Sequence, residues 1–196
     1  MTMRPRLKGI MMRNLLKYAG IALLVTGLAA CDNNGDKKQT ADHSAHASQA
    51  DQTVTLLGGK LTFTLPPGMA DKSDKLSTQD SNRHVWADNS GQRAIIAFEG
   101  TDSDETLEAM ASRLEEQQRS RDPQLQVVTS KAITVDGQTL HQLDTVISSN
   151  NQSAWSSIVL GKIDGKLLTL QISLPAENQQ QSQTEAESII NSIKLK

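Results

Sequence analysis

Cysteine, aromatic residues and excess basic charge are all scarce in this sequence. Its 196 residues include one cysteine, and aromatic residues make up 3% of the chain. One cysteine cannot form an internal disulfide, so the fold must be held together by packing alone. So few aromatic side chains predict a core of Leu, Ile, Val and Ala and argue against a sugar-binding platform of stacked rings. The net charge of −2 disfavours nucleic-acid binding, because no basic excess is available to contact phosphates.

A long hydrophobic run is also missing. The most apolar stretch, residues 19–30, has about twelve residues, whereas a membrane-spanning helix needs about twenty. Arg13 and Lys17 precede the stretch and small residues end it, a pattern typical of a secretory signal peptide. We therefore expect residues 1–30 to be removed and to take no part in the fold. A signal peptide would naturally start at Met12, so we interpret residues 1–11 as an extension from an upstream start codon.

The cysteine directly follows this run. The segment Leu28-Ala29-Ala30-Cys31 resembles the lipobox of bacterial lipoproteins. The resemblance implies that Cys31 Sγ receives a diacylglycerol, that the peptide is cut before Cys31, and that the new amino group is acylated. A thiol suits this step because its thiolate is a good nucleophile. The alternative is a buried structural cysteine after a chance apolar run. Apart from the acyl chains we expect no cofactor and no metal.

The two residues that follow the cysteine are expected to form a sorting signal. Asp32 resembles the signal that retains lipoprotein chains in the inner membrane, and Asn33 fits the stronger forms of that signal. The resemblance implies a protein anchored on the periplasmic face of the inner membrane. Its expected partners are that membrane and an unknown membrane or periplasmic protein.

Residues 31–52 are polar and show no apolar period, which predicts a flexible tether. About twenty such residues span on the order of 25 Å, enough to lift a domain clear of the headgroups. His43 and His46 lie in this segment. They are either a weak metal site or, as we favour because no third ligand is close, two solvated side chains.

Residues 53–196 show the alternation of an α+β domain. A hairpin is expected over 54–65, with Gly58-Gly59 at its turn, and two more strands over 84–88 and 93–99. A helix follows, capped by Asp102 or Ser103 and ended before Pro123, with apolar residues at helical spacing. Four strands of an antiparallel meander then follow, and a final helix covers 176–193. The expected meander strands are 127–135, 140–147, 154–163 and 167–174, joined by turns at Asp136-Gly137, Asn150-Asn151 and Asp164-Gly165.

No catalytic signature is present. The sequence has no G-x-S-x-G, no H-E-x-x-H and no Gly-rich phosphate loop. His141 and Asp144 are three residues apart on an expected strand, so they should lie on opposite faces and not form a dyad. His84 shares a face with Trp86, either as a ligand-binding side chain or, as we favour, as a partly buried strand residue. Ser156 and Ser157 are interpreted as edge residues.

Four residues are candidates for binding a partner. Arg119 and Arg121 lie near the end of the first expected helix, where they either complement the helix dipole or form a basic spot for headgroups or an acidic loop. Trp86 and Trp155 are large aromatic residues in an aromatic-poor chain, and tryptophan is enriched at binding hot spots. Core packing is the alternative that we favour for both.

Several stretches resemble the DcrB family of periplasmic lipoproteins. They are residues 12–18, 27–32, 84–86 and, most specifically, the long run 113–129. The resemblance covers nearly all of the chain from Met12 onward and implies a Mog1/PsbP-like fold, an antiparallel sheet between helices. Relatives with this fold are mostly binding modules, including chaperones for secreted effectors and nuclear-transport factors. The family is linked to bacteriophage infection and to envelope integrity, and it implies no catalytic residues.

Three functions remain open at this point. The first is a tethered, non-enzymatic binding module, the second an enzyme acting on lipid or peptidoglycan, and the third an envelope-maintenance protein that acts indirectly. We favour the first because of the anchor, the single domain and the missing catalytic signature. An enzyme would need titratable groups gathered in a pocket, which distant residues can form.

Overall fold

The structure, a computed structural model, describes residues 51–75, 81–149 and 152–196. The expected signal peptide, the lipidated cysteine and residues 31–50 of the expected tether, as well as the turn at Asn150-Asn151, lie outside these residues. Gln52, the last residue assigned to the tether, is instead the first residue of a strand. The elements are β1 (Gln52–Leu56), η1 (Leu57–Gly59), β2 (Leu61–Leu65), β3 (Ala70–Asp71), η2 (Ser73–Lys75), β4 (Arg83–Ala87), β5 (Ala94–Thr101), α1 (Leu107–Arg121), β6 (Gln126–Val135), β7 (Gln138–Ser149), β8 (Gln152–Ile163), β9 (Lys166–Pro175), α2 (Gln179–Asn191) and β10 (Lys194–Leu195).

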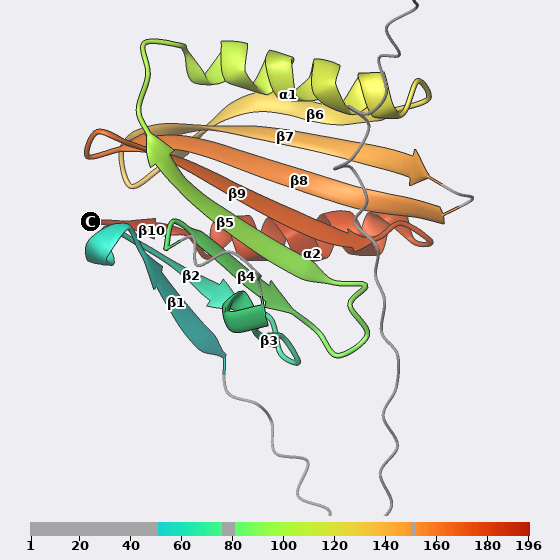
Figure 1. Ribbon diagram of the computed structural model, residues 1–196, viewed down its shortest axis with the longest axis horizontal. Helices are drawn as coiled ribbons and strands as arrows, with labels where there is room; N and C mark the ends of the chain where they lie inside the picture. Colours follow the sequence, from blue (N-terminus) through green and yellow to red (C-terminus); the bar gives the residue numbers. More distant parts are fainter. Residues whose placement is uncertain (1–50, 76–80, 150–151) are drawn as a thin grey trace, which may run out of the picture. The chain divides into compact units, whose positions relative to one another are not determined.

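Seven strands form one antiparallel sheet in the order β3-β4-β5-β9-β8-β7-β6 (Figure 1). The last four of these in sequence, β6 to β9, are the expected meander, and each pairs with its neighbour along the chain. The pairing of β5 with β9 joins this meander to the N-terminal strands, with Ala97 opposite Leu170. Strands β1, β2 and β10 form a separate sheet of three.

Two Asp-Gly turns fix the register of the meander. Asp136 and Gly137 have φ angles of 46° and 83°, and Asp164 and Gly165 have 50° and 74°. Positive φ at both central residues defines the type I′ turn, whose twist matches that of paired antiparallel strands. The hairpins predicted at both Asp-Gly pairs are therefore confirmed.

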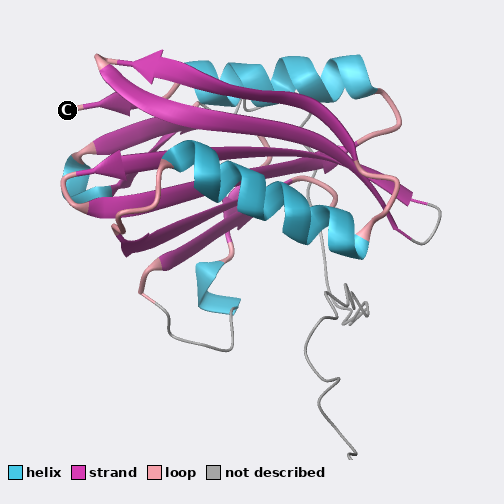
Figure 2. Ribbon diagram, turned by 90° about the horizontal axis from the view of Figure 1, so that it is seen from above, coloured by secondary structure: helices cyan, strands magenta, loops and turns pink. Residues whose placement is uncertain are grey.

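The large sheet is covered on both faces. Helix α1 packs on β7 and β8 from one side, while α2 and the small sheet pack from the other (Figure 2). Strand β7 is buried on both sides as a result, with Leu140 and Val146 toward α2 and Leu143 toward α1. The two-sided cover explains why the apolar residues of β7 do not alternate strictly in sequence. The predicted α+β architecture is confirmed.

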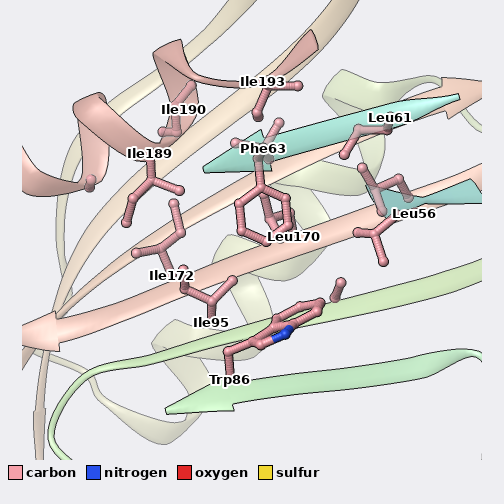
Figure 3. Close-up of a cluster of buried hydrophobic side chains, with 14 of the residues drawn as sticks. Leu56, Leu61, Phe63, Trp86, Ile95, Leu170, Ile172, Ile189, Ile190 and Ile193 are labelled. Atoms are coloured by element: carbon pink, nitrogen blue, oxygen red, sulfur yellow. The ribbon is translucent and has the colours of Figure 1, made fainter. Parts of the chain in front are cut away.

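The main core lies between the large sheet, α2 and β2. Its centre includes Phe63 from β2 and Trp86 from β4, whose rings meet edge to face at 5.5 Å and 84°. Figure 3 shows Ile189, Ile190 and Ile193 reaching toward the same cluster from the end of α2. Most of the core is aliphatic, as the composition predicted.

Several details of the chain differ from the sequence-based expectation. Helix α1 is capped by Thr106, whose Oγ1 accepts a hydrogen bond from the Ala109 N–H at 3.2 Å, so the expected caps Asp102 and Ser103 are wrong. Asp102 is instead held by an ion pair with Lys162 at 2.8 Å. The final helix, expected over 176–193, is shorter at both ends, and the strands β3 and β10 were not expected, because two residues carry no periodic signal.

Candidate functional site

The two tryptophans proposed as partner contacts are buried. Trp86 is 5% exposed and stacks on His84 with ring centroids 5.9 Å apart, and Trp155 is 1% exposed. A side chain enclosed in the core cannot contact a partner directly. We therefore correct both assignments to core packing, the alternative kept open from the sequence. The strand position predicted for His84, half-buried beside Trp86, is confirmed.

The two arginines lie at the end of α1, as expected. Arg119 forms an ion pair with Glu115 at 2.9 Å and donates a weak hydrogen bond to the Leu125 carbonyl at 3.4 Å. Arg121 is exposed and forms no ion pair with any described residue. Both cations complement the helix dipole, and a role for them in partner binding stays a prediction.

Asp122, next to these arginines, has a structural role that the sequence did not reveal. Its carboxylate accepts hydrogen bonds from the Gln124 N–H at 2.9 Å and the Ser148 N–H at 2.7 Å. The side chain is 5% exposed, so it ties the end of α1 to the end of β7 from inside the fold.

His141 and Asp144 lie on opposite faces of β7, as predicted, and do not form a dyad. His141 faces α1, where its Nε2 lies 3.0 Å from the Ser130 hydroxyl. Burial lowers the pKa of His141, against the opposing charge of Glu108. No carboxylate hydrogen-bonds this imidazole among the described residues. The Ser130–His141 contact therefore holds β6 against β7 and lacks the third member of a catalytic triad.

Buried polar side chains on the opposite face of β7 and β8 form two hydrogen-bonded pairs. The Gln142 amide donates to the Asp144 carboxylate at 2.7 Å, and the Trp155 indole N–H donates to the Ser157 hydroxyl at 2.8 Å. Burial raises the pKa of Asp144, against opposing effects of Ser157, Gln142 and Lys131. Ser156 and Ser157 lie in the middle of the sheet and are 2% and 0% exposed, so their assignment to a sheet edge is wrong.

A groove of about 340 Å³ opens above this polar cluster, between the end of α2 and the strands β6 and β7. Ile133 and Val135 of β6 and Ile190 of α2 give it apolar walls, and Gln142 provides an amide at one side. The full lining consists of residues from β6 and the turn after it, from β7, and from the chain between the C-terminal half of α2 and the start of β10: Lys131, Ile133, Thr134, Val135, Asp136, Gln142, Glu187, Ile190, Asn191, Ile193 and Lys194.

The acidic side chains of the groove have hydrogen-bond partners within the protein, whereas its two lysines form no ion pair with any described residue. Asp136 accepts a hydrogen bond from the Leu195 N–H at 2.8 Å, and Glu187 accepts one from the Gln183 amide at 3.0 Å. Lys131 and Lys194 take part in none of the ion pairs within the described ranges. The groove thus combines apolar walls with two available cations, which suits binding better than acid–base chemistry.

A second hollow, of about 740 Å³, lies between the start of the domain at Asp51 and α2. Its one arginine, Arg93, donates from Nε to Glu185 at 2.9 Å and forms an ion pair with the same carboxylate. Because that pair is neutral and the remaining lining is mainly hydroxyl, amide and proline side chains, this hollow offers less specific recognition than the groove.

The part of the chain that the structure describes contains no group of three His, Cys, Asp or Glu side chains placed to hold a metal ion. It also contains no helix long and apolar enough to cross a bilayer.

The fold is shared with two solved structures. PsbP of the cyanobacterium Synechocystis superposes with a TM-score of 0.59 at 15% identity, covering 79% of this chain and 98% of that chain. The Ran-binding protein Mog1p of Saccharomyces cerevisiae gives a TM-score of 0.53 at 14% identity, covering 74% and 95%. These likenesses define the class of protein by its fold: a Mog1/PsbP-like α+β domain, as predicted.

Sequence comparison identifies the family within that class. The DcrB family pattern matches residues 61–192. A relative from Shigella flexneri, named inner membrane lipoprotein DcrB, is 55% identical over 183 residues, which is 93% of this chain and 98% of the relative. The chain therefore belongs to the DcrB family and is a homologue of an inner membrane lipoprotein.

Sequence reasoning considered Asp144 only as a partner of His141 and did not predict its buried pairing with Gln142, although a signal for that pairing exists. Both members of the pair alternate with Leu140 and Val146, so strict alternation would have placed two polar side chains on the same buried face. The groove itself has no such signal, because it forms between segments about fifty residues apart in the chain.

Proposed function

We propose that this protein is anchored through a lipidated Cys31 on the periplasmic face of the inner membrane. There its domain serves as a non-enzymatic binding module needed for infection by certain bacteriophages and for envelope integrity. The observation that carries the proposal is the match to an inner membrane lipoprotein over 93% of the chain. A continuous span of that length includes the position of Cys31 wherever it begins.

The chemistry of the anchor supports attachment to the membrane. One fatty chain gives only marginal binding, and each buried CH₂ contributes about 0.8 kcal/mol. Three chains on Cys31 would make attachment effectively permanent. Asp32 and Asn33 would then act as the sorting signal, and the polar segment up to residue 50 would separate the domain from the headgroups.

The groove between α2 and β6 supports binding over catalysis. Its carboxylates are engaged in hydrogen bonds within the protein, and the buried Asp144 is covered by Gln142. Its apolar walls and available lysines offer contacts and charge, which are the means of recognition.

The anchor is tested by metabolic labelling with an alkyne-bearing fatty acid, followed by membrane fractionation. We expect Cys31→Ser to lose the label and leave the membrane. Asp32→Ser should keep the label and move to the outer membrane, while the neighbouring Asn34→Ser should behave as wild type. Labelled Cys31→Ser protein would contradict the lipidation site.

The binding role is tested in intact cells with photoreactive residues at Thr134, Phe98 and Arg121, three exposed positions on different parts of the domain. We expect a discrete adduct from at least one position, lost in Asp32→Ser cells together with bacteriophage sensitivity. If every position gave no adduct while infection remained normal, the indirect envelope-maintenance function would replace this proposal.

A further inference from the structure

Strand β6 is a long edge strand of the large sheet. Its ten residues pair with β7 on one side only, and no described strand pairs with its other side (Figure 1). On an antiparallel edge, every second residue directs its N–H and C=O away from the sheet. The opposite edge of the same sheet, β3, has only two residues. Among the described residues, the outer side of β6 therefore has no strand partner and is available for a further strand.

The groove described above runs beside this edge. Lys131, Ile133 and Val135 occupy alternate positions of β6, so their side chains share the face that lines the groove. Ile190 of α2 forms part of the opposite wall. A strand added to β6 would place every second side chain over these residues. This is the arrangement in which main-chain hydrogen bonds give affinity and pockets give specificity.

The charges indicate what such a strand carries. Lys131 lies at one end of the groove, and Lys194 lies at the other, next to the Asp136 turn to which Leu195 is hydrogen-bonded. The described residues provide no ion-pair partner for either lysine. Asp136 and Glu187 also line the groove, but both already accept hydrogen bonds within the protein. An apolar strand with an acidic residue at each end is therefore complementary to the two lysines that lack ion-pair partners and to the apolar wall between them.

We infer that β6 receives an extended segment of another envelope protein as an eighth strand, with apolar side chains in the groove and acidic residues beside Lys131 and Lys194. The inference rests on the proposed binding function and names its surface and the chemistry of its partner.

A second copy of this chain fits the edge less well than a different protein. Pairing two β6 strands would bring a further lysine to a groove that already has two without partners. The β-bulge between Val127 and Thr129, with Val128 44% exposed, also interrupts one end of the edge. Bulges and edge lysines are common devices against such self-pairing. They leave residues 129–135 for an acidic partner.

Hydrogen–deuterium exchange on the mature lipidated protein in detergent tests this geometry directly. The probe is the synthetic heptapeptide Asp-Thr-Val-Thr-Val-Thr-Asp, and the matched control replaces both aspartates by lysine. We expect the acidic probe to slow exchange of alternate amides within 129–135, with no change in β3. The basic control should leave β6 unprotected. Absence of protection in β6 by the acidic probe, or equal protection by both peptides, would overturn the inference.

Charge reversal provides the paired variants. Lys131→Glu should weaken binding of the acidic probe about tenfold, because a favourable contact becomes repulsive. Arg83→Glu reverses another exposed cation, on β4, that takes part in none of the ion pairs of the described residues, and it should change the affinity less than about twofold. Equal effects of the two substitutions would show that general electrostatics, not the groove, attracts the peptide.

The same cross-linking positions distinguish a failure of this inference from a failure of the proposed binding function. An adduct at Thr134 that is lost in Lys131→Glu and kept in Arg83→Glu supports both. Adducts at Phe98 or Arg121 without one at Thr134 would overturn the β6 surface and leave the binding function in place. No adduct at any position would count against both.

Discussion

Asp144 is the least exposed titratable side chain among the described residues. The side chain is 2% exposed, and burial raises its pKa even though Gln142 and Ser157 favour the charged form. A carboxyl whose pKa is higher in the folded than in the unfolded state binds its proton more tightly when folded. Its contribution to stability is therefore complete at pH values below its unfolded pKa of about 3.9. The contribution is lost as the pH rises through the folded pKa.

We expect Asp144→Asn to gain stability relative to wild type as the pH rises from 4 to 8. Asparagine has similar shape, keeps an oxygen for the Gln142 amide, and does not ionise. The measurement is the urea midpoint of both proteins at the two pH values, with exposed Asp104→Asn as the control. A difference between Asp144→Asn and wild type that did not change with pH would contradict the raised pKa.

At the scale of elements, α1 shows how a helix start is chosen. The sequence suggested two caps, Asp102 and Ser103, but the Thr106 hydroxyl is the one that accepts the Ala109 N–H, while Asp102 pairs with Lys162. Because Asp102 forms an ion pair with Lys162 of β8, it does not cap the helix. The residues between β5 and Thr106 form a loop.

Thr106→Ala should lower the free energy of unfolding by about 1 kcal/mol, the usual loss for an N-cap. Ser103→Ala is the matched control and should change it by less than about 0.5 kcal/mol, because that side chain is exposed and caps nothing. Urea unfolding monitored by circular dichroism measures both. Equal losses would mean that the helix begins earlier than the structure shows.

At the scale of the whole molecule, the last four residues join separate parts of the fold. Ile193 and Leu195 are 2% and 8% exposed in the main core, and β10 pairs with β2. The Leu195 N–H also donates a hydrogen bond to the Asp136 carboxylate at the β6–β7 turn, and the Lys196 N–H donates one to the Lys60 carbonyl at 2.9 Å. The C-terminus therefore links the small sheet, α2 and the meander.

Removing residues 193–196 should destabilise the protein by more than about 3 kcal/mol, since loss of one large buried aliphatic side chain alone costs about 2–5 kcal/mol. Removing Lys196 alone deletes one hydrogen bond and should cost no more than about 1.5 kcal/mol. Denaturant unfolding of the two truncated proteins measures the contrast. Similar small losses would show that the small sheet is held mainly by β1 and β2.

The sequence by itself determined the local features of this protein. Alternating apolar residues predicted the strands, the two Asp-Gly pairs predicted the I′ turns, and helical spacing predicted α1 and α2. These signals are local because turn geometry and side-chain period depend on neighbouring residues. The lipobox-like segment ending at Cys31 likewise carries its information in a few adjacent residues, and its role stays a prediction.

Only the tertiary structure decided which segments meet. The β5–β9 pairing, the burial of Trp86 and Trp155, and the groove beside β6 all depend on contacts between distant parts of the chain. A tryptophan has the same sequence signal in a core as at a binding surface, since burial depends on what packs over it. The free edge of β6 is likewise a property of the completed sheet: a strand is an edge only when no other segment pairs with it.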